Sequence, residues 1–295
     1  MKKSYFFLLT SAICIFIFFG YELWINTQIS EPQFDGSRAF QDIPQQIAFG
    51  PRTTGSEAQE KFLSWLIENL GSAGWQSSIQ QTEMLGHSIK NVIAKRGNEK
   101  PQIILLAHYD SRLLADNDSD PIKQILPVPG ANDGASGVAV LLELARILPV
   151  DSVPVWLVFV DAEDNGRIPG WDWILGSRAF AASLTDKPKA VVLVDMIGDA
   201  DLNIYMEKNS DPELTKQIWG VAKNLGFEKS FIPQYKYQVI DDHIPFLEIG
   251  IPAVDIIDLD YKYWHTSQDT ADKVSPGSLQ RVGETLLKWI STQKP

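Results

Sequence analysis

The sequence predicts an α/β protein, a three-layer α/β/α sandwich whose central sheet is mixed and mostly parallel. Two observations predict this class. Short apolar runs rich in β-branched residues alternate along the chain with segments of helical periodicity. Several of these runs are apolar at nearly every position, as is typical of strands that are covered on both faces. Sites in such folds lie beyond the carboxyl ends of the strands, so we expect the chemistry there.

The expected strands follow these apolar runs. The run VWLVFV is the clearest, because six consecutive apolar residues leave no face for solvent. Strands are predicted at residues 91–96, 102–107, 155–160, 190–195, 202–206 and 253–257.

Capping signals mark several of the expected helices. Ser56 with Gln59 resembles a capping box, and an amphipathic segment follows it as far as Gly71. Ser275 followed by Pro276 suits the N-cap and first residue of a final helix. Helices are predicted at residues 56–71, 134–148, 173–182, 212–225 and 276–289.

The N-terminus carries a signal for export. Two lysines precede a charge-free run over residues 5–21. We interpret residues 1–26 as a signal anchor that holds the body at the membrane, outside the cytoplasm. A cleaved signal peptide, which would release a secreted or periplasmic protein, is the alternative. Residues 27–34 are predicted to be a linker and residues 35–295 a single catalytic domain.

Charge and composition exclude several classes of function. The chain has 37 acidic and 26 basic residues and a net charge of −11, which disfavours binding to nucleic acid. Its one cysteine, Cys14, lies in the N-terminal apolar run, so the body has no disulfide and no cysteine zinc site. No serine nucleophile elbow and no phosphate-binding glycine loop occurs. Nothing in the sequence indicates an oligomer.

Polar clusters stand at the predicted strand ends and helix starts. They are HYDS at 108–111, the glycine-rich ANDGASG at 131–137, DAED at 161–164, Asp195, DDH at 241–243 and WHT at 264–266. Acidic groups gathered in one crevice repel one another and lose hydration, and a divalent cation would remove that cost. Histidine and carboxylate ligands without thiolates suit a catalytic zinc. In the pair Glu163–Asp164, one carboxylate could bind metal while the other stays free as a base.

The order and separation of these motifs resemble the M28 family of zinc aminopeptidases and, within its clan, the glutaminyl-peptide cyclotransferases. The resemblance covers residues 35–295 and implies the same three-layer fold. It implies that one zinc is bound by Asp133, Asp164 and His265. In the peptidase branch, His108 and Asp195 would bind a second zinc, with Asp133 as the bridge.

Within that clan, the sequence favours a cyclotransferase that converts an N-terminal glutamine of peptides or proteins to pyroglutamate and releases ammonia. Trp264 before His265 supports this branch, whereas Asp255 stands where the animal enzymes have a histidine. A two-zinc aminopeptidase is the alternative. The resemblance implies the following roles: Glu163 as general base and acid, Asp195 and Asp241 as partners of the amide nitrogen, and Trp264, with Trp171 or Trp173, as the pocket wall. Simple packing is the alternative for Trp171 and Trp173.

Overall fold

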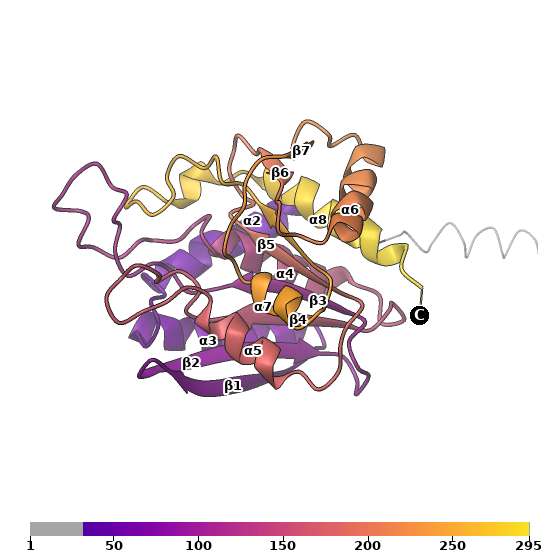
Figure 1. Ribbon diagram of the computed structural model, residues 1–295, viewed down its shortest axis with the longest axis horizontal. Helices are drawn as coiled ribbons and strands as arrows, with labels where there is room; N and C mark the ends of the chain where they lie inside the picture. Colours follow the sequence, from indigo (N-terminus) through magenta and orange to yellow (C-terminus); the bar gives the residue numbers. More distant parts are fainter. Residues whose placement is uncertain (1–31, 295) are drawn as a thin grey trace, which may run out of the picture. The chain divides into compact units, whose positions relative to one another are not determined.

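Four adjacent, buried parallel strands form the larger part of a six-stranded sheet (Figure 1). The strand order is β1-β2-β4-β3-β5-β8, and β1 and β2 are the antiparallel members. The computed structural model describes residues 32–294. The strands are β1 (Gln76–Met84), β2 (His87–Lys95), β3 (Ile103–His108), β4 (Val155–Val160), β5 (Ala190–Asp195) and β8 (Ala253–Ile257).

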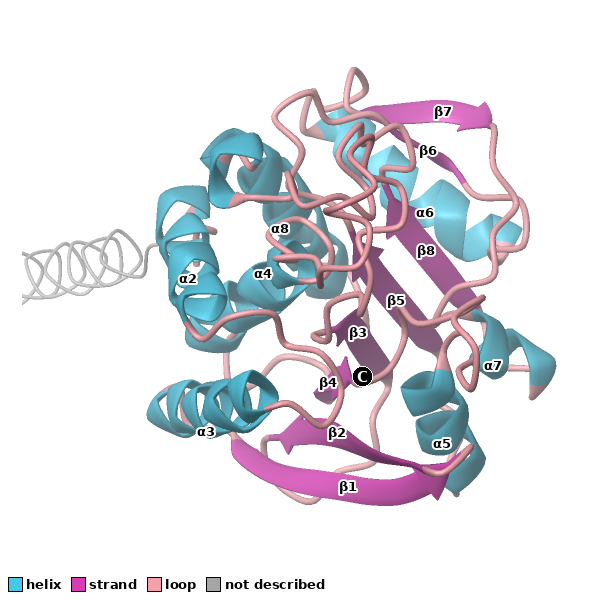
Figure 2. Cartoon of the chain, turned by 90° about the vertical axis from the view of Figure 1, so that its left-hand side faces the viewer, coloured by secondary structure: helices cyan, strands magenta, loops and turns pink. Residues whose placement is uncertain are grey.

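Alternate residues of each central strand face two different layers of helices. On β3, Leu105 and Ala107 belong to the larger core, which also contains residues of α2, α3, α4, α6 and α8. Ile104 and Leu106 belong to the other core, with Phe180 of α5 and Phe246 of α7. Figure 2 shows helices on both sides of the sheet. The predicted α/β fold with a mixed sheet is therefore confirmed.

The helices begin and end close to the predicted residues wherever a capping signal is present. Ser56 accepts a hydrogen bond from the backbone N–H of Gln59, as the motif predicts. Ser275 caps the last helix and Pro276 is its first residue. The helices are α2 (Gly36–Ala48), α3 (Glu57–Ser72), α4 (Ala135–Ile147), α5 (Leu175–Ser183), α6 (Pro212–Asn224), α7 (Ile244–Glu248), α8 (Pro276–Ser291) and the 3-10 helix Ala271–Lys273.

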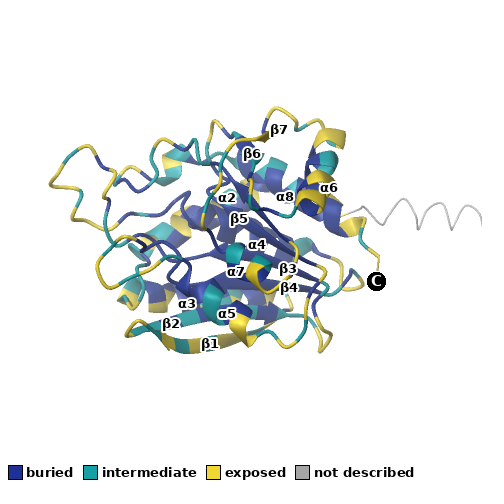
Figure 3. Ribbon diagram, viewed as in Figure 1, coloured by how far each residue is buried: buried dark blue, intermediate teal, exposed yellow. Residues whose placement is uncertain are grey.

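Two elements have no clear signal in the sequence. Strand β1 lies at the edge of the sheet and has no buried residue (Figure 3), so its sequence QSSIQQTEM lacks an apolar face. Helix α2 contains Pro44, which weakens any helical prediction. The predicted strand at 202–206 is short and belongs to a separate two-stranded sheet, β6 (Ile204–Met206) with β7 (Phe231–Tyr235).

The N-terminal predictions fall on residues that the structure does not describe. The signal anchor at 1–26 and most of the linker at 27–34 lie outside the described residues. Within residues 32–294, no helix has both the length and the apolar character needed to cross a membrane.

The sheet predicts where a substitution destabilises the fold. Leu105 is fully buried at the centre of the sheet, so Leu105→Ala is expected to lower the free energy of unfolding by about 2–5 kcal/mol. Ile79 on the edge strand is 46% exposed, and Ile79→Ala should change it by less than about 1 kcal/mol. Urea unfolding of both variants measures the difference. Equal losses in the two variants would contradict this account of the core.

Candidate metal centre and active site

The candidate site lies at the carboxyl edge of the central sheet. His108 is the last residue of β3, Asp195 is the last residue of β5, and Glu163 and Asp164 follow β4. These three strands are parallel and adjacent, so their polar ends meet at one edge. The edge predicted from the sequence is therefore where the acidic groups gather.

A glycine lets the loop before α4 approach this edge closely. Gly134, the N-cap of α4, lies directly against His108. A Cβ added there would lie 2.6 Å from Nε2 of His108, closer than real Cβ contacts occur. Because Gly134 has no side chain, Asp133 can be placed over the end of β3.

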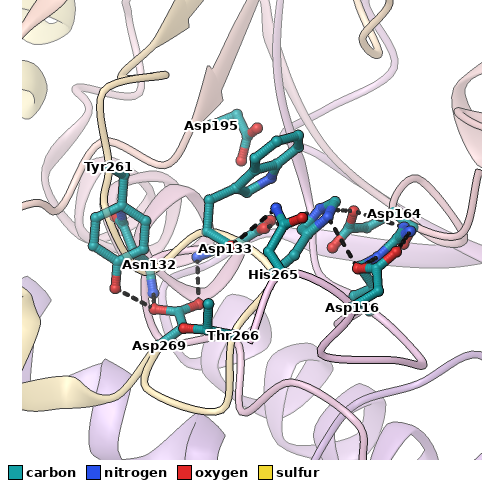
Figure 4. Close-up of polar contacts among 12 residues, drawn as sticks. Asp116, Asn132, Asp133, Asp164, Asp195, Tyr261, His265, Thr266 and Asp269 are labelled. Atoms are coloured by element: carbon teal, nitrogen blue, oxygen red, sulfur yellow. Dashed lines mark hydrogen bonds and ion pairs between the residues drawn. The ribbon is translucent and has the colours of Figure 1, made fainter. Parts of the chain in front are cut away.

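Asp133 stands between two groups of side chains. Its Oδ1 lies 3.1 Å from Nε2 of His108, and that same nitrogen lies 3.0 Å from Oδ1 of Asp195. Its Oδ2 lies 3.9 Å from Nε2 of His265, which lies 2.8 Å from Oδ1 of Asp164. Figure 4 shows Asp133, Asp164 and Asp195 around His265. In each group of three, one ligand atom per residue lies within 4.8 Å of the others.

These groups fit a bound divalent metal ion. Asp133, Asp164 and His265 are all buried, and Oδ2 of both aspartates has no hydrogen-bond partner. Buried carboxylate oxygens without partners are costly unless a cation binds them. Imidazole nitrogens and carboxylate oxygens are the donors that zinc accepts in catalytic sites.

Two further carboxylates lie near the Nδ1 atoms of the two candidate histidine ligands. Nδ1 of His108 lies 3.5 Å from Asp110, and Nδ1 of His265 lies 3.6 Å from Asp116. Each ring therefore turns its Nε2 towards the candidate metal position. This arrangement of carboxylate, histidine and metal fixes ring orientation and tautomer in metal sites.

Asp269 holds the loop that carries Asp133. It accepts hydrogen bonds from the backbone N–H groups of Asn132, at 2.9 Å, and Asp133, at 3.2 Å. It also accepts one from the hydroxyl of Tyr261 at 2.6 Å (Figure 4). Burial raises the pKa of Asp269 to about 7, and the negative charge of Asp133 adds to the shift.

Glu163 belongs to neither ligand group and lines a cavity. Its backbone N–H and that of Asp164 both donate to the carboxylate of Asp110, and Asp164 lines the same cavity. Burial raises the pKa of Glu163 well above its usual value, and the negative charges of Asp164 and Asp241 raise it further. A carboxyl group with a raised pKa, free of ligand contacts, is suited to accept and return a proton.

The cavity beside Glu163 has a volume of about 310 Å³, near the lower end of small-ligand sites, and suits a single terminal residue. Asp241 lies in its wall, and burial raises the pKa of that carboxyl to about 7, with the charge of Asp195 as a further cause. The lining residues are Asp133, Glu163, Asp164, Arg167, Trp173, Asp195, Met196, Gln238, Val239, Ile240, Asp241, Ile257, Leu259 and Trp264.

The structure separates the three predicted tryptophans. Trp173 and Trp264 line the cavity, and the Trp173 ring is stacked 6.2 Å from that of His265. Trp171 does not line it. Its indole stacks on His87 of β2 at 3.5 Å, so the packing alternative describes Trp171. Two residues apart in one loop, the two rings point to different surroundings, which the sequence does not indicate.

Behind the cavity lies a polar cluster that sequence reasoning found only in part. His243 is fully buried, with Nε2 3.3 Å from Glu207 and Nδ1 3.9 Å from Asp255. Burial acts to raise the pKa of Glu207, but the nearby His243 ring and hydrogen bonds from the backbone N–H groups of Asn209 and Val239 lower it to about 2. The DDH motif and Asp255 pointed to this region, but nothing marked Glu207, which lies after β6.

Comparison with known proteins places the chain in a family. Residues 91–290 match the model of peptidase family M28, and the chain belongs to that family. A glutaminyl-peptide cyclotransferase-like protein of Bos taurus is 24% identical over 82% of this chain and 71% of that protein.

Two solved bacterial structures have the same fold over nearly the whole chain. A glutaminyl cyclase from Tannerella forsythia is 32% identical with a TM-score of 0.83, over 89% of this chain and 100% of that one. A Zn-dependent exopeptidase from Parabacteroides distasonis is 28% identical with a TM-score of 0.83, over 90% of this chain and 100% of that one.

The role of Asp269 can be tested by metal affinity. Asp269→Asn weakens the acceptor that fixes the Asp133 loop, so zinc affinity should fall about 10- to 100-fold. Competition with a chromogenic zinc chelator measures this. Asp272→Asn makes the same replacement of a carboxylate by an amide at an exposed site three residues away and serves as the control. Unchanged zinc affinity in Asp269→Asn would refute the positioning role.

Proposed function

We propose that this chain is a zinc-dependent glutaminyl-peptide cyclotransferase, which converts an N-terminal glutamine to pyroglutamate and releases ammonia. One observation carries the proposal. This chain is 32% identical to a solved glutaminyl cyclase and covers the full length of that cyclase. Its buried Glu163 lines one cavity with carboxylates of the histidine–carboxylate cluster and belongs to neither ligand group. The enzyme acts on the N-terminal segments of peptides or proteins.

Asp133, Asp164 and His265 would hold the zinc ion. Their unpartnered buried oxygens and the exopeptidase relative both support this assignment. When bound, zinc supplies a Lewis acid that polarises the carbonyl of the glutamine side chain. Glu163 is not part of this ligand set, so its carboxyl remains available for proton transfer.

Glu163 moves the proton that the reaction requires. The substrate's α-amino nitrogen attacks Cδ of its own side chain and forms the ring bond, and the bond from Cδ to the amide nitrogen breaks. Glu163 accepts a proton from the attacking nitrogen and delivers it to the departing nitrogen, which leaves as ammonia. Because its pKa is raised, Glu163 can hold a proton at a pH closer to neutrality. The protonated form is the one that delivers a proton to the departing nitrogen.

Asp195 and Asp241 orient the side-chain amide. Both carboxyls line the cavity with Glu163, and carboxylate oxygens accept hydrogen bonds from an NH₂ group. Trp173 and Trp264 narrow the same cavity and exclude water. Exclusion matters because attack by water would give glutamate and not pyroglutamate.

The site of action follows from the N-terminal interpretation. We propose that residues 1–26 export the chain, as a membrane anchor or as a cleaved signal peptide, and that residues 35–295 form the catalytic domain. The enzyme then meets its substrates outside the cytoplasm.

One observation favours a second candidate, a two-zinc aminopeptidase. His108, Asp133 and Asp195 form a second complete group of ligand atoms that shares Asp133 with the first. Two metals bridged by one carboxylate are typical of aminopeptidases. Glu163 would then accept a proton from water in place of the substrate's amine.

A substitution tests the role of Glu163. Glu163→Gln keeps the shape but removes the proton acceptor, so kcat/KM for a glutamine-initiated peptide should fall at least about 100-fold. The zinc content of the purified protein, measured by elemental analysis, should stay unchanged because Glu163 is not in either ligand group. Retained turnover would show that another group transfers the proton.

A product assay separates the two candidate functions. Wild-type protein is given a glutamine-initiated and a leucine-initiated peptide, and mass spectrometry weighs the products. Loss of ammonia from the glutamine peptide alone, with one tightly bound zinc per chain, is the expected result. Release of a whole residue from the leucine peptide, with two zincs per chain, would establish the aminopeptidase instead.

A further inference from the structure

One basic side chain lies among the acidic groups of the cavity. Five lining residues are acids, and Arg167 is the one lysine or arginine among the residues that line it. Arg167 is exposed while it contributes to the lining, so it lies where the cavity opens to solvent.

Arg167 has no partner among the described residues. Neighbouring arginines are paired: Arg112 binds Asp116 at 2.6 Å, and Arg178 binds Glu248 at 2.8 Å. Within residues 32–294, Arg167 forms no ion pair and no side-chain hydrogen bond. Its guanidinium is therefore available to a molecule in the cavity mouth.

Hydrogen bonds and packing hold the backbone next to Arg167 in place. Buried Arg112 donates hydrogen bonds to the carbonyl oxygens of Asp164, at 2.8 Å, and Gly166, at 3.2 Å. Gly166 lies flush against the indole of Trp173, where a Cβ would overlap the ring. The turn that carries Arg167 is thus tied to a metal-ligand candidate on one side and to the cavity wall on the other.

The conformation of Arg167 is itself unfavourable for an arginine. Its φ is +65°, in the left-handed region, which costs a residue with a Cβ roughly 1–2 kcal/mol relative to the right-handed one. Glycine would relieve that cost. A long cationic side chain kept at a strained position beside a cavity points to a use for the side chain.

We propose that Arg167 is a specificity-determining residue that binds a carboxylate of the substrate, just beyond the N-terminal glutamine. This inference rests on the proposed function, because a glutamine at Glu163 and Asp241 directs the rest of the peptide towards the mouth. Arginine presents paired N–H donors that match a carboxylate. The carboxylate is either the side chain of the second residue or the C-terminus of a dipeptide.

The charge of the protein makes this contact useful. With a net charge of −11, the molecule repels acidic peptides, and five acids line the cavity itself. A cation at the mouth offsets that repulsion over about 8–10 Å, the range of unscreened charge at ordinary ionic strength. Acidic substrates are therefore selected by their local contact with Arg167, although the net charge of the protein repels them.

The experiment compares four substrates: Gln-Ala-amide, Gln-Glu-amide, Gln-Lys-amide and Gln-Ala with a free C-terminus. For wild type, kcat/KM for at least one carboxylate-bearing substrate should exceed that for Gln-Ala-amide about three- to tenfold, and Gln-Lys-amide should be poorest. Preference for Gln-Glu-amide would show that Arg167 binds the side-chain carboxylate of the second residue. Preference for Gln-Ala with a free C-terminus would show that it binds the C-terminal carboxylate. The preference should shrink as salt rises.

Variants of Arg167 then test whether this side chain causes the substrate preference. Arg167→Gln should lower the ratio of the preferred substrate to Gln-Ala-amide towards one, whereas Arg167→Lys should keep part of it. The matched control Arg178→Gln makes the same change at an ion-paired arginine that does not line the cavity, and should leave the ratio unchanged.

The outcomes distinguish this inference from the proposed function. If wild type cyclises none of the four substrates, the proposed function and the role of Arg167 both fail. If it cyclises all four with kcat/KM values within twofold, or if Arg167→Gln keeps the wild-type ratio, cyclisation stands and the role of Arg167 is overturned.

Discussion

The concentration of buried carboxyl groups at one sheet edge is the constraint on which the rest of this structure depends. Asp133, Asp164, Asp195, Glu163 and Asp241 all lie within the lining of one cavity. Burial opposes their ionisation and each raises the cost of charging the next, so such a cluster is stable only beside positive charge. Arg112, which lies 3.7 Å from Oδ1 of Asp164, supplies part of that charge, and a divalent cation held by the candidate ligands would supply the rest.

Polar contacts around the site therefore orient the loops that carry the candidate ligands. Buried Arg52 donates to the carbonyl oxygens of Tyr109, after β3, and Gly130, before α4. Burial lowers its pKa to about 10, which still leaves it charged at neutral pH. Asp110 accepts from the backbone N–H groups of Glu163 and Asp164. These contacts tie together the α2–α3 loop, the loop from β3 to α4 and the loop after β4, so that the candidate ligands are positioned before a metal binds.

The two possible chemistries of this site differ in what reaches Glu163. If the substrate's own amine occupies the cavity and the tryptophans exclude water, the product is a ring and ammonia. If water reaches the same carboxyl, the product is a cleaved peptide. The ligand groups are compatible with either, so selection lies in the wall and mouth of the cavity, formed by the loops at 164–174, 238–241 and 257–264.

The sequence by itself determined the buried framework and the chemical character of the site. Strands β4, β5 and β8 begin and end at the predicted residues, because a strand buried on both faces must be an unbroken apolar run. The HYDS and DAED motifs marked the site because they directly follow such runs, at the edge of the sheet where polar side chains gather, whereas WHT was marked by its resemblance to a family motif. Edge strand β1 escaped prediction, since a strand without any buried residue needs no apolar pattern.

Only the tertiary structure decided which side chains meet. Asp133 lies between the two histidines, and Trp171 stacks on His87 outside the cavity lining. Arg167 lies in the mouth of the cavity without an ion-pair partner among residues 32–294. None of these facts follows from spacing along the chain, because each depends on segments that are distant in the sequence packing against one another. Periodicity reports whether a residue faces the core, but contact between distant loops is fixed by the packing of the whole domain.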